Sequence, residues 1–98
     1  MRPSFAVEES LVALGHNIKV ARLKRRLPQS VLSDRAGVSL STLAKIESGN
    51  GGVAIASYAA VLMALELGTP FSDIGRNDPL AMVLETEALP KRIRKSGK

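Results

Sequence analysis

The sequence contains no cysteine and no tryptophan, and its aromatic residues are limited to two phenylalanines and one tyrosine. A chain without cysteine forms neither disulfides nor thiolate metal sites, which is typical of an intracellular protein, and we expect a cytoplasmic location. The core must then consist mainly of Leu, Val, Ile and Ala. Glu8 and Glu9 interrupt any apolar run near the N-terminus, and the longest apolar stretch, residues 53–65, is shorter than the roughly 20 residues that cross a bilayer. We therefore expect one small domain with a tail, without a signal peptide or a membrane span.

Groups that carry catalysis or bind metals are also scarce. His16 is the single histidine, and no carboxylate partner for it is evident. Asp73 and Asp78 lie five residues apart without the further ligands of a calcium loop. The run GNGG at residues 49–52 lacks the lysine and the strand–loop–helix context of a phosphate-binding loop. We therefore expect no enzyme, no cofactor and no metal ion.

Charge is distributed unevenly along the chain, whose formal net charge is +5. Residues 17–50 carry seven basic and two acidic side chains, and residues 51–90 carry one basic and five acidic ones. Residues 91–98 carry five basic side chains and no acidic one. A basic block followed by an acidic block and a basic tail suggests that one face meets a polyanion. The charge pattern by itself is equally compatible with a solvated surface.

The periodicity of apolar residues predicts helices throughout the chain. Leu11, Leu14, Ile18 and Ala21 follow the i, i+3, i+4 rule and predict a first helix over residues 8–26. Pro28 suits the first turn of a second, short helix that ends at Gly37, a residue that tolerates left-handed backbone angles. Ser39 is a good N-cap for a third helix over residues 40–47, which would bury Leu43 and Ile46.

The second half of the sequence predicts further helices. A fourth carries Tyr58, Val61, Leu62 and Leu65 on one stripe and ends at Gly68-Thr69-Pro70. Phe71 and Ile74 would close a short fifth helix. Asn77-Asp78-Pro79 reads as a cap and first-turn proline for a last helix around Leu80, Val83 and Leu84. The fold class that we expect is therefore all-α, a compact domain of four to five helices with a short C-terminal helix and a basic tail.

Two short helices joined by a glycine-containing turn are typical of a helix-turn-helix unit. Leu32, Ala36, Val38, Leu43 and Ile46 would form the shared core. The outward side chains of the third helix would then be short hydrogen-bonding groups and one lysine, Lys45. Such side chains suit a helix that lies in the major groove of DNA. The alternative is a helix of small residues that packs on another protein.

These residues resemble the lambda-repressor-like (XRE or Cro/C1-type) helix-turn-helix family over residues 11–74. The matching residues are Arg22, Gln29, Leu32, Ala36-Gly37-Val38-Ser39, Leu43, Ile46-Glu47-Ser48-Gly49 and Leu65. The chain departs from the family in having Ser33 where Ala is frequent and Val53 where Pro is frequent. The first would weaken helix packing slightly, and the second would leave the loop of residues 49–52, expected to be flexible, less rigid.

The resemblance implies a role for each residue of the DNA-binding surface. Gln29 would bind a backbone phosphate and brace the third helix. Ser39 and Thr42 would contact phosphate or the edge of the groove, and Leu40, Ser41 and Lys45 would face the bases. Ser48 and Asn50 would touch the far backbone.

The resemblance also implies an ion pair between Arg22 and Glu47. Without such a pair, Glu47 would repel phosphate at the end of a DNA-reading helix, and its charge would oppose the helix dipole there. The alternative is an exposed Glu47 without a partner.

A narrower resemblance concerns the run from Gly49 to Ile74 and the tail sequence LPKRIR. Both are similar to the HipB-like antitoxins, autorepressors that bind an operator as a dimer and hold a HipA-like kinase toxin. We therefore expect a homodimer on a pseudo-palindromic operator in double-stranded DNA, with a HipA-like toxin as a candidate partner and no membrane partner. The tail could equally be a plain disordered segment.

The resemblance and the helix pattern together suggest a domain organisation. An N-terminal arm would cover residues 1–10, the helix-turn-helix domain residues 11–75, a C-terminal helical and dimerisation segment residues 76–90, and the basic tail residues 91–98. The apolar residues beyond Pro70 would supply the dimer interface. A free-standing regulator without a toxin, and a module that binds proteins alone, remain alternatives.

Overall fold

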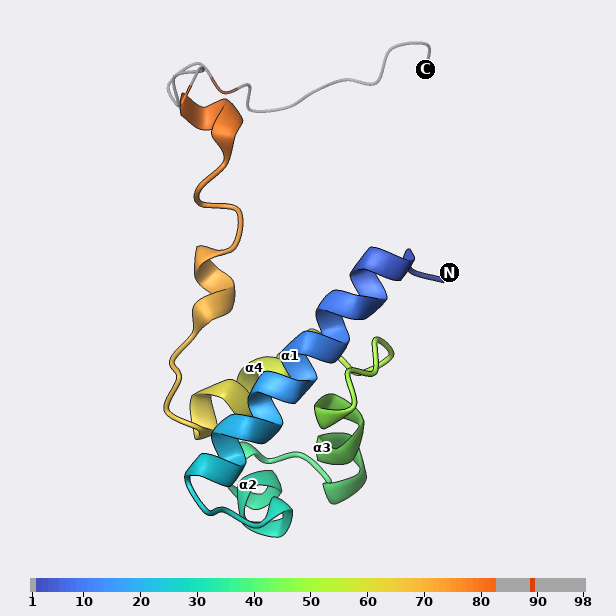
Figure 1. Cartoon of the computed structure of the whole chain (residues 1–98). Coiled ribbons are helices and arrows are strands. Elements are labelled where there is room, and N and C mark those ends of the chain that lie inside the picture. Colours follow the sequence, from blue (N-terminus) through green and yellow to red (C-terminus); the bar gives the residue numbers. More distant parts are fainter. Residues whose placement is uncertain (1, 83–88, 90–98) are drawn as a thin grey trace.

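The structure, a computed structural model, describes residues 2–82 and 89. Four α-helices are followed by two short 3₁₀ helices, and this part of the chain contains no strand (Figure 1). The elements are α1 (Phe5–Lys24), α2 (Gln29–Ala36), α3 (Leu40–Glu47), α4 (Ile55–Ala64), η1 (Pro70–Asp73) and η2 (Pro79–Met82). The prediction of an all-α helix-turn-helix fold is confirmed. None of these helices combines the length and the apolar character that a membrane crossing needs.

The first helix begins three residues earlier than its apolar periodicity predicts. Ser4 caps it with a side-chain oxygen that accepts a hydrogen bond from the main-chain N–H of Val7 at 3.3 Å. The helix ends at Lys24, two residues earlier than predicted, because the chain turns at Arg26, which adopts a positive φ of 55°. Most of the segment expected to be an N-terminal arm is therefore helical.

The turn between α2 and α3 follows the sequence prediction. Gly37 ends α2 in the left-handed region at φ 73°, where an L-residue would be strained. Ser39 caps α3, and its Oγ accepts a hydrogen bond from the N–H of Thr42 at 3.0 Å. Pro28 is the N-cap of α2 and not its first helical residue, so its missing N–H still removes no helical bond.

The core lies between the four helices and contains a single aromatic residue. α1 packs mainly on α3, and α2 packs mainly on α4. The buried residues are Ile18, Leu32, Leu43, Ile46, Tyr58, Val61, Leu62 and Leu65. Ser33, also buried, lies among them as a small residue and donates its hydroxyl to the main-chain oxygen of Ser30 at 3.1 Å.

Two glycines allow α1 to cross the end of α3 at very short range. A Cβ on Gly15 would collide with the main-chain oxygens of Ile46 and Glu47, and one on Gly49 would lie 2.5 Å from the Cα of Val12. Gly49 also has φ 81°. The two backbones are therefore in direct contact, and this contact fixes the distance between α1 and the end of α3.

The loop after α3, which the sequence suggests is flexible, is held at both ends. Tyr58 of α4 donates its hydroxyl to the main-chain oxygen of Asn50 at 2.7 Å. The side-chain oxygen of Asn50 accepts a hydrogen bond from the N–H of Gly52 at 2.6 Å. Val53 replaces the family's proline and packs against the core. These contacts compensate for the absence of a proline in the loop.

A buried ion pair joins α1 to the end of α3. Nε of Arg22 lies 2.6 Å from Oε2 of Glu47, and Nη2 lies 3.1 Å from Oε1. Nη1 donates to the main-chain oxygen of Leu27 at 2.9 Å. The two side chains are 9% and 5% exposed. The contact is bidentate and shielded from water, so removal of either side chain would leave the other charge buried without its partner.

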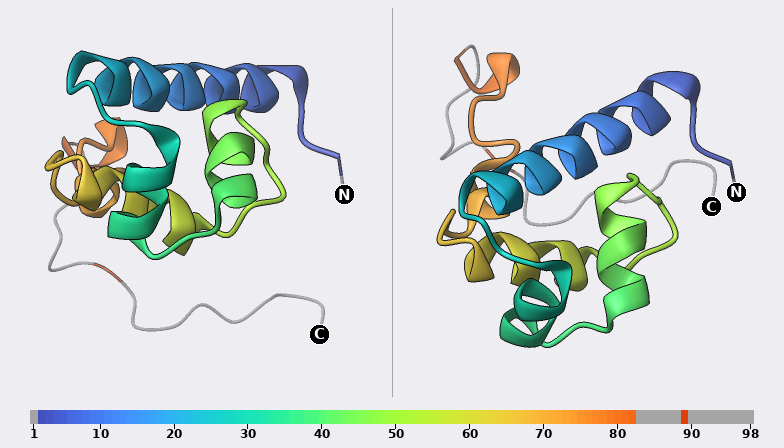
Figure 2. Two further views of the ribbon diagram at one scale, coloured as in Figure 1. Left: turned by 90° about the horizontal axis from the view of Figure 1, so that it is seen from below. Right: turned by 60° about the horizontal axis from the view of Figure 1, so that its bottom comes forward.

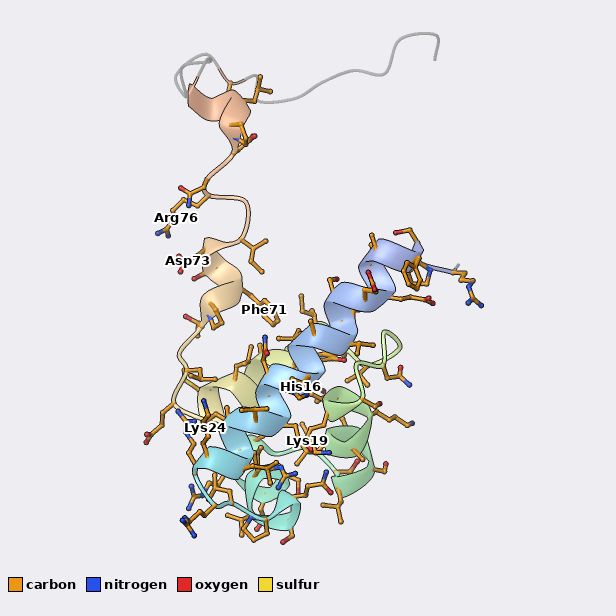
Figure 3. All side chains as sticks on the ribbon, viewed as in Figure 1. His16, Lys19, Lys24, Phe71, Asp73 and Arg76 are labelled. Atoms are coloured by element: carbon orange, nitrogen blue, oxygen red, sulfur yellow. The ribbon has the colours of Figure 1, made fainter. Side chains whose placement is uncertain are left out.

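The chain after α4 differs from the expected fifth and sixth helices. η1 and η2 are single 3₁₀ turns on an arm that leaves the helical body (Figure 1). Asp78 caps η2 by accepting a hydrogen bond from the N–H of Leu80 at 3.1 Å. Phe71 is half-buried against the core and points toward α1 (Figure 3), so it is not surplus for a dimer interface. Val83, Leu84 and the basic tail lie outside the described residues.

We predict that Arg22→Ala and Glu47→Ala each destabilise the fold by about 3–5 kcal/mol, because either change leaves one charge buried without its partner. That loss is a large part of the roughly 5–15 kcal/mol expected for a domain. Arg22→Lys should not restore stability, because an ammonium cannot reproduce the forked contact. Urea denaturation followed by circular dichroism measures the effect.

The matched control is Arg76→Ala. It removes an exposed ion pair with Asp73, whose side chains are 71% and 64% exposed, and should cost less than about 1 kcal/mol. A melting temperature unchanged by Arg22→Ala would contradict the assignment of a stabilising buried pair.

We predict that Tyr58→Phe lowers the free energy of unfolding by about 1 kcal/mol, because the oxygen of Asn50 loses its partner. Burial raises the pKa of Tyr58 above its usual 10.0, so the fold favours the neutral phenol. The contribution of that phenol is fully present below pH 10 and is lost as the pH rises through the folded-state pKa. The difference in stability between the two proteins should therefore shrink at alkaline pH. A difference that stays constant in urea titrations from pH 7 to pH 11 would contradict this assignment.

Candidate nucleic-acid interface

The exposed face of α3 consists of small residues and one lysine. Ser41, Ala44, Lys45 and Ser48 recur at the i, i+3, i+4, i+7 spacing, and all four are exposed. The opposite face buries Leu43 and Ile46 in the core. Among these four side chains only Lys45 projects far from the helix, so a groove edge can approach the backbone of α3 closely.

The N-terminal end of α3 gathers three hydroxyl groups. The Oγ of Ser39 donates to Oγ1 of Thr42 at 2.8 Å and lies 3.5 Å from Oγ of Ser41. Thr42 is half-buried, whereas Ser39, Leu40 and Ser41 are exposed, Leu40 by 51%. The hydroxyl of Ser39 thus makes both of its capping hydrogen bonds to Thr42. Ser41 and Leu40 remain at the surface, at the end of the helix where the dipole favours an anion.

Glu47 contributes no charge to the exposed face of α3. It is the one acidic residue of the helix, and its carboxylate is turned inward to Arg22. Gln29, the first residue of α2, donates a further hydrogen bond from Nε2 to Oε1 of Glu47 at 3.0 Å. The side-chain amide of Gln29 has two N–H groups, so one remains for another acceptor. Gln29 therefore links the start of α2 to the end of α3.

The C-terminal end of α3 places the last two expected residues at the surface. Ser48 donates its hydroxyl to the main-chain oxygen of Lys45 at 2.9 Å, which closes the final turn. Asn50 is exposed, and because its side-chain oxygen is bonded to Gly52, its NH₂ group is the part available to a ligand. Ser48 and Asn50 thus lie at the C-terminal end of the face that carries Lys45, and Gln29 lies beside Glu47.

One member of this face was not predicted from the sequence, and one basic cluster has no predicted role. Ala44 is exposed between Ser41 and Ser48, and the three-residue step from Ser41 would have identified it. Lys24, Arg25 and Arg26 gather at the end of α1, exposed and without an acidic partner in the described part of the chain. On α1 itself, Lys19 lies on the side toward α3 (Figure 3).

One comparison with known proteins gives a match that agrees with this geometry. The profile of the helix-turn-helix family matches residues 18–74, which include the end of α1 and all of α2, α3 and α4. No curated protein and no solved structure matches the chain. The family match covers more than half of the 98 residues. The chain therefore belongs to the lambda-repressor-like (XRE) helix-turn-helix family of DNA-binding transcription regulators.

Proposed function

We propose that the protein is a sequence-specific repressor that binds a pseudo-palindromic operator as a dimer, with α3 in the major groove. The observation that carries this proposal is the exposed face of α3. It bears small side chains and Lys45, while its single carboxylate is neutralised by Arg22 and bonded by Gln29. A surface of this kind can approach stacked bases without steric or electrostatic repulsion.

The residues of the interface take different parts. Lys45 donates to guanine O6 or N7, and Leu40 and Ser41 contact neighbouring base edges. Gln29 and the N-terminal end of α3, with Ser39 and Thr42, lie along one phosphate strand. Ser48 and Asn50 lie along the other, through the NH₂ group of Asn50.

A dimer contacts more base pairs than a single recognition helix can. A single α3 covers a few base pairs, and closed two-fold dimers are the commonest oligomers. The half-sites should then be separated by about 34 Å, one turn of DNA, or by a multiple of it.

We further propose that the repressor is the antitoxin of a type II toxin–antitoxin system and holds a HipA-like kinase toxin. The support is the similarity to HipB-like antitoxins of the run from Gly49 to Ile74 and of the tail sequence LPKRIR. A kinase-like reading frame beside the gene would distinguish an antitoxin from a free-standing regulator. A folded protein that binds no DNA would leave only a module that binds other proteins.

The test of DNA reading compares two variants on the DNA upstream of the protein's own gene, first located by footprinting. Lys45→Ala should cost about 1–3 kcal/mol at one base pair and relax the preference there. Gln29→Ala should weaken specific and non-specific DNA alike, because phosphate contacts position a protein without reading sequence. Titrations against operators with single base changes measure both effects.

Arg76→Ala is the control, because it removes one positive charge from the arm, away from α3. It should leave base preference unchanged. If Lys45→Ala weakens every DNA sequence equally, Lys45 contacts phosphate and the assignment to a base is wrong. Since Gln29 also bonds Glu47, its variant must first be shown to keep its melting temperature.

A second test concerns the basic tail. Removing residues 90–98 takes away five positive charges. We expect the truncated protein to bind its operator with an unchanged dependence on salt, because an acidic block separates the tail from the exposed face of α3 in the sequence. We expect its affinity for the toxin to be much weaker. If the tail followed the phosphates, the salt slope would flatten by close to one unit for each phosphate that the truncated protein no longer neutralises. A decrease of about three or more would contradict our expectation.

A further inference from the structure

The first helix presents an uncovered apolar face beside the face that meets the core. α1 has 20 residues and is therefore about 30 Å long. It forms one edge of the described fold, with α2, α3 and α4 all on one side of it (Figure 2). Phe5, Val12 and Leu23 are 74%, 55% and 53% exposed. These three large apolar side chains lie along one solvated face of α1, so this face can bury apolar area against a partner.

These three residues belong to a regular seam along α1. Its positions follow steps of four, three, four, three and four residues, the spacing of a coiled-coil stripe. The seam consists of Phe5, Glu9, Val12, His16, Lys19 and Leu23, all of them exposed. Within the described residues, the side chains of Glu9, His16 and Lys19 make no hydrogen bond or ion pair. A hollow on this face is lined by Phe5, Glu9, Val12 and His16.

We propose that this seam is the dimer interface, which pairs with the same seam of a second copy in antiparallel orientation. About a two-fold axis at the level of Leu14, Phe5 meets Leu23 of the second copy, Glu9 meets Lys19, and Val12 meets the ring of His16. Each contact occurs twice, as a closed two-fold interface requires. Phe5 and Leu23 thus bury apolar surface against each other, Val12 packs on an aromatic ring, and each acid meets a base.

The charge pattern selects a second copy in this orientation. In a parallel pair, Glu9 would face Glu9 and Lys19 would face Lys19, which is destabilising. The acidic group lies in the N-terminal half of the seam and the basic group in the C-terminal half, so reversal of one helix matches them. An unrelated partner would not require the two halves of one helix to complement each other.

The pairing leaves the DNA-reading face accessible. Gly15 lies where α1 touches the end of α3, and at 3.6 residues per turn the seam is centred roughly a quarter turn further around the helix. Two copies joined through their seams therefore carry their α3 helices beside the α1 pair and not between its members. The inference rests on the proposed function in one respect, because it identifies the surface of the dimer proposed to bind the operator. It also replaces the interface beyond Pro70 that the sequence suggests.

Charge reversal tests the pairing in the full chain without DNA. Glu9→Lys and Lys19→Glu should each raise the dimer dissociation constant about tenfold or more, because both copies of the contact then join like charges. An equal mixture of the two variants should form heterodimers with near-wild-type affinity, since both contacts again join opposite charges. The double variant should likewise recover. Sedimentation equilibrium measures the association.

Apolar variants provide the matched comparison. Phe5→Ser should weaken the dimer, whereas Ile74→Ser, at a residue of similar exposure on the arm, should not. Circular dichroism melting checks that each variant is folded. A wild-type monomer at high micromolar concentration, no recovery in the mixture, or an effect of Ile74→Ser alone would overturn the proposal.

Binding of a single operator half-site separates this inference from the proposed function. Folded variants that no longer dimerise should still bind a half-site with the weak affinity of one α3. If the dimer behaves as described but no variant or wild-type protein binds the DNA, the proposed function fails and the interface stands. If the protein binds DNA as a dimer and the substitutions in the seam leave the dimer dissociation constant unchanged, the proposed interface is wrong and the proposed function stands.

Discussion

The bidentate contact between Arg22 and Glu47 is the interaction on which the position of α3 depends. One guanidinium binds the carboxylate that ends α3 and the main-chain oxygen of Leu27 in the turn before α2. Gln29 adds the start of α2 to the same carboxylate. Three elements therefore meet at one carboxylate, which holds the start of α2 against the end of α3. The same contact removes a negative charge from the end of the helix proposed to face DNA.

Close backbone packing supplies the second constraint. Gly15 and Gly49 bring α1 against the end of α3 with no side chain between them, and Tyr58 ties the following loop to α4. A domain of this size has a modest core, so it cannot rely on buried apolar area alone. The pair of charges, the glycine contact and the tyrosine hydroxyl all act at the same end of α3. Rigidity is thus concentrated beside the residues that would meet the DNA backbone, Ser48 and Asn50.

α1 has two faces with different tasks in this scheme. One face, with Gly15, Ile18 and Arg22, holds α3 in place. The other carries the seam from Phe5 to Leu23, and its N-terminal part reaches beyond the helical body. A pairing through the seam would transmit the position of one α3 to the other through two rigid helices. The spacing of the half-sites would then be determined by helix packing and not by flexible segments.

The sequence by itself determined the local elements of the helix-turn-helix unit. Gly37, Ser39 and the periodicity of residues 40–47 specify the turn, the cap and the buried face of α3, because backbone angles and capping bonds are local properties. The Arg22–Glu47 contact was expected through resemblance to a family, and the exposed Ser41 and Lys45 followed from helical spacing. The start of α1 was misplaced because its first turns lie beyond the core and follow the cap at Ser4, not the apolar pattern.

Only the tertiary structure decided what each face touches. The collision that a Cβ on Gly15 would cause arises from the position of Ile46, 31 residues later in the chain, and the bond of Tyr58 to Asn50 depends on how α4 returns to the loop. Phe71 was assigned to an interface and lies against the core, because α4 ends where the chain can fold back on it. Such contacts join distant residues, and no local pattern of apolar and polar side chains encodes them.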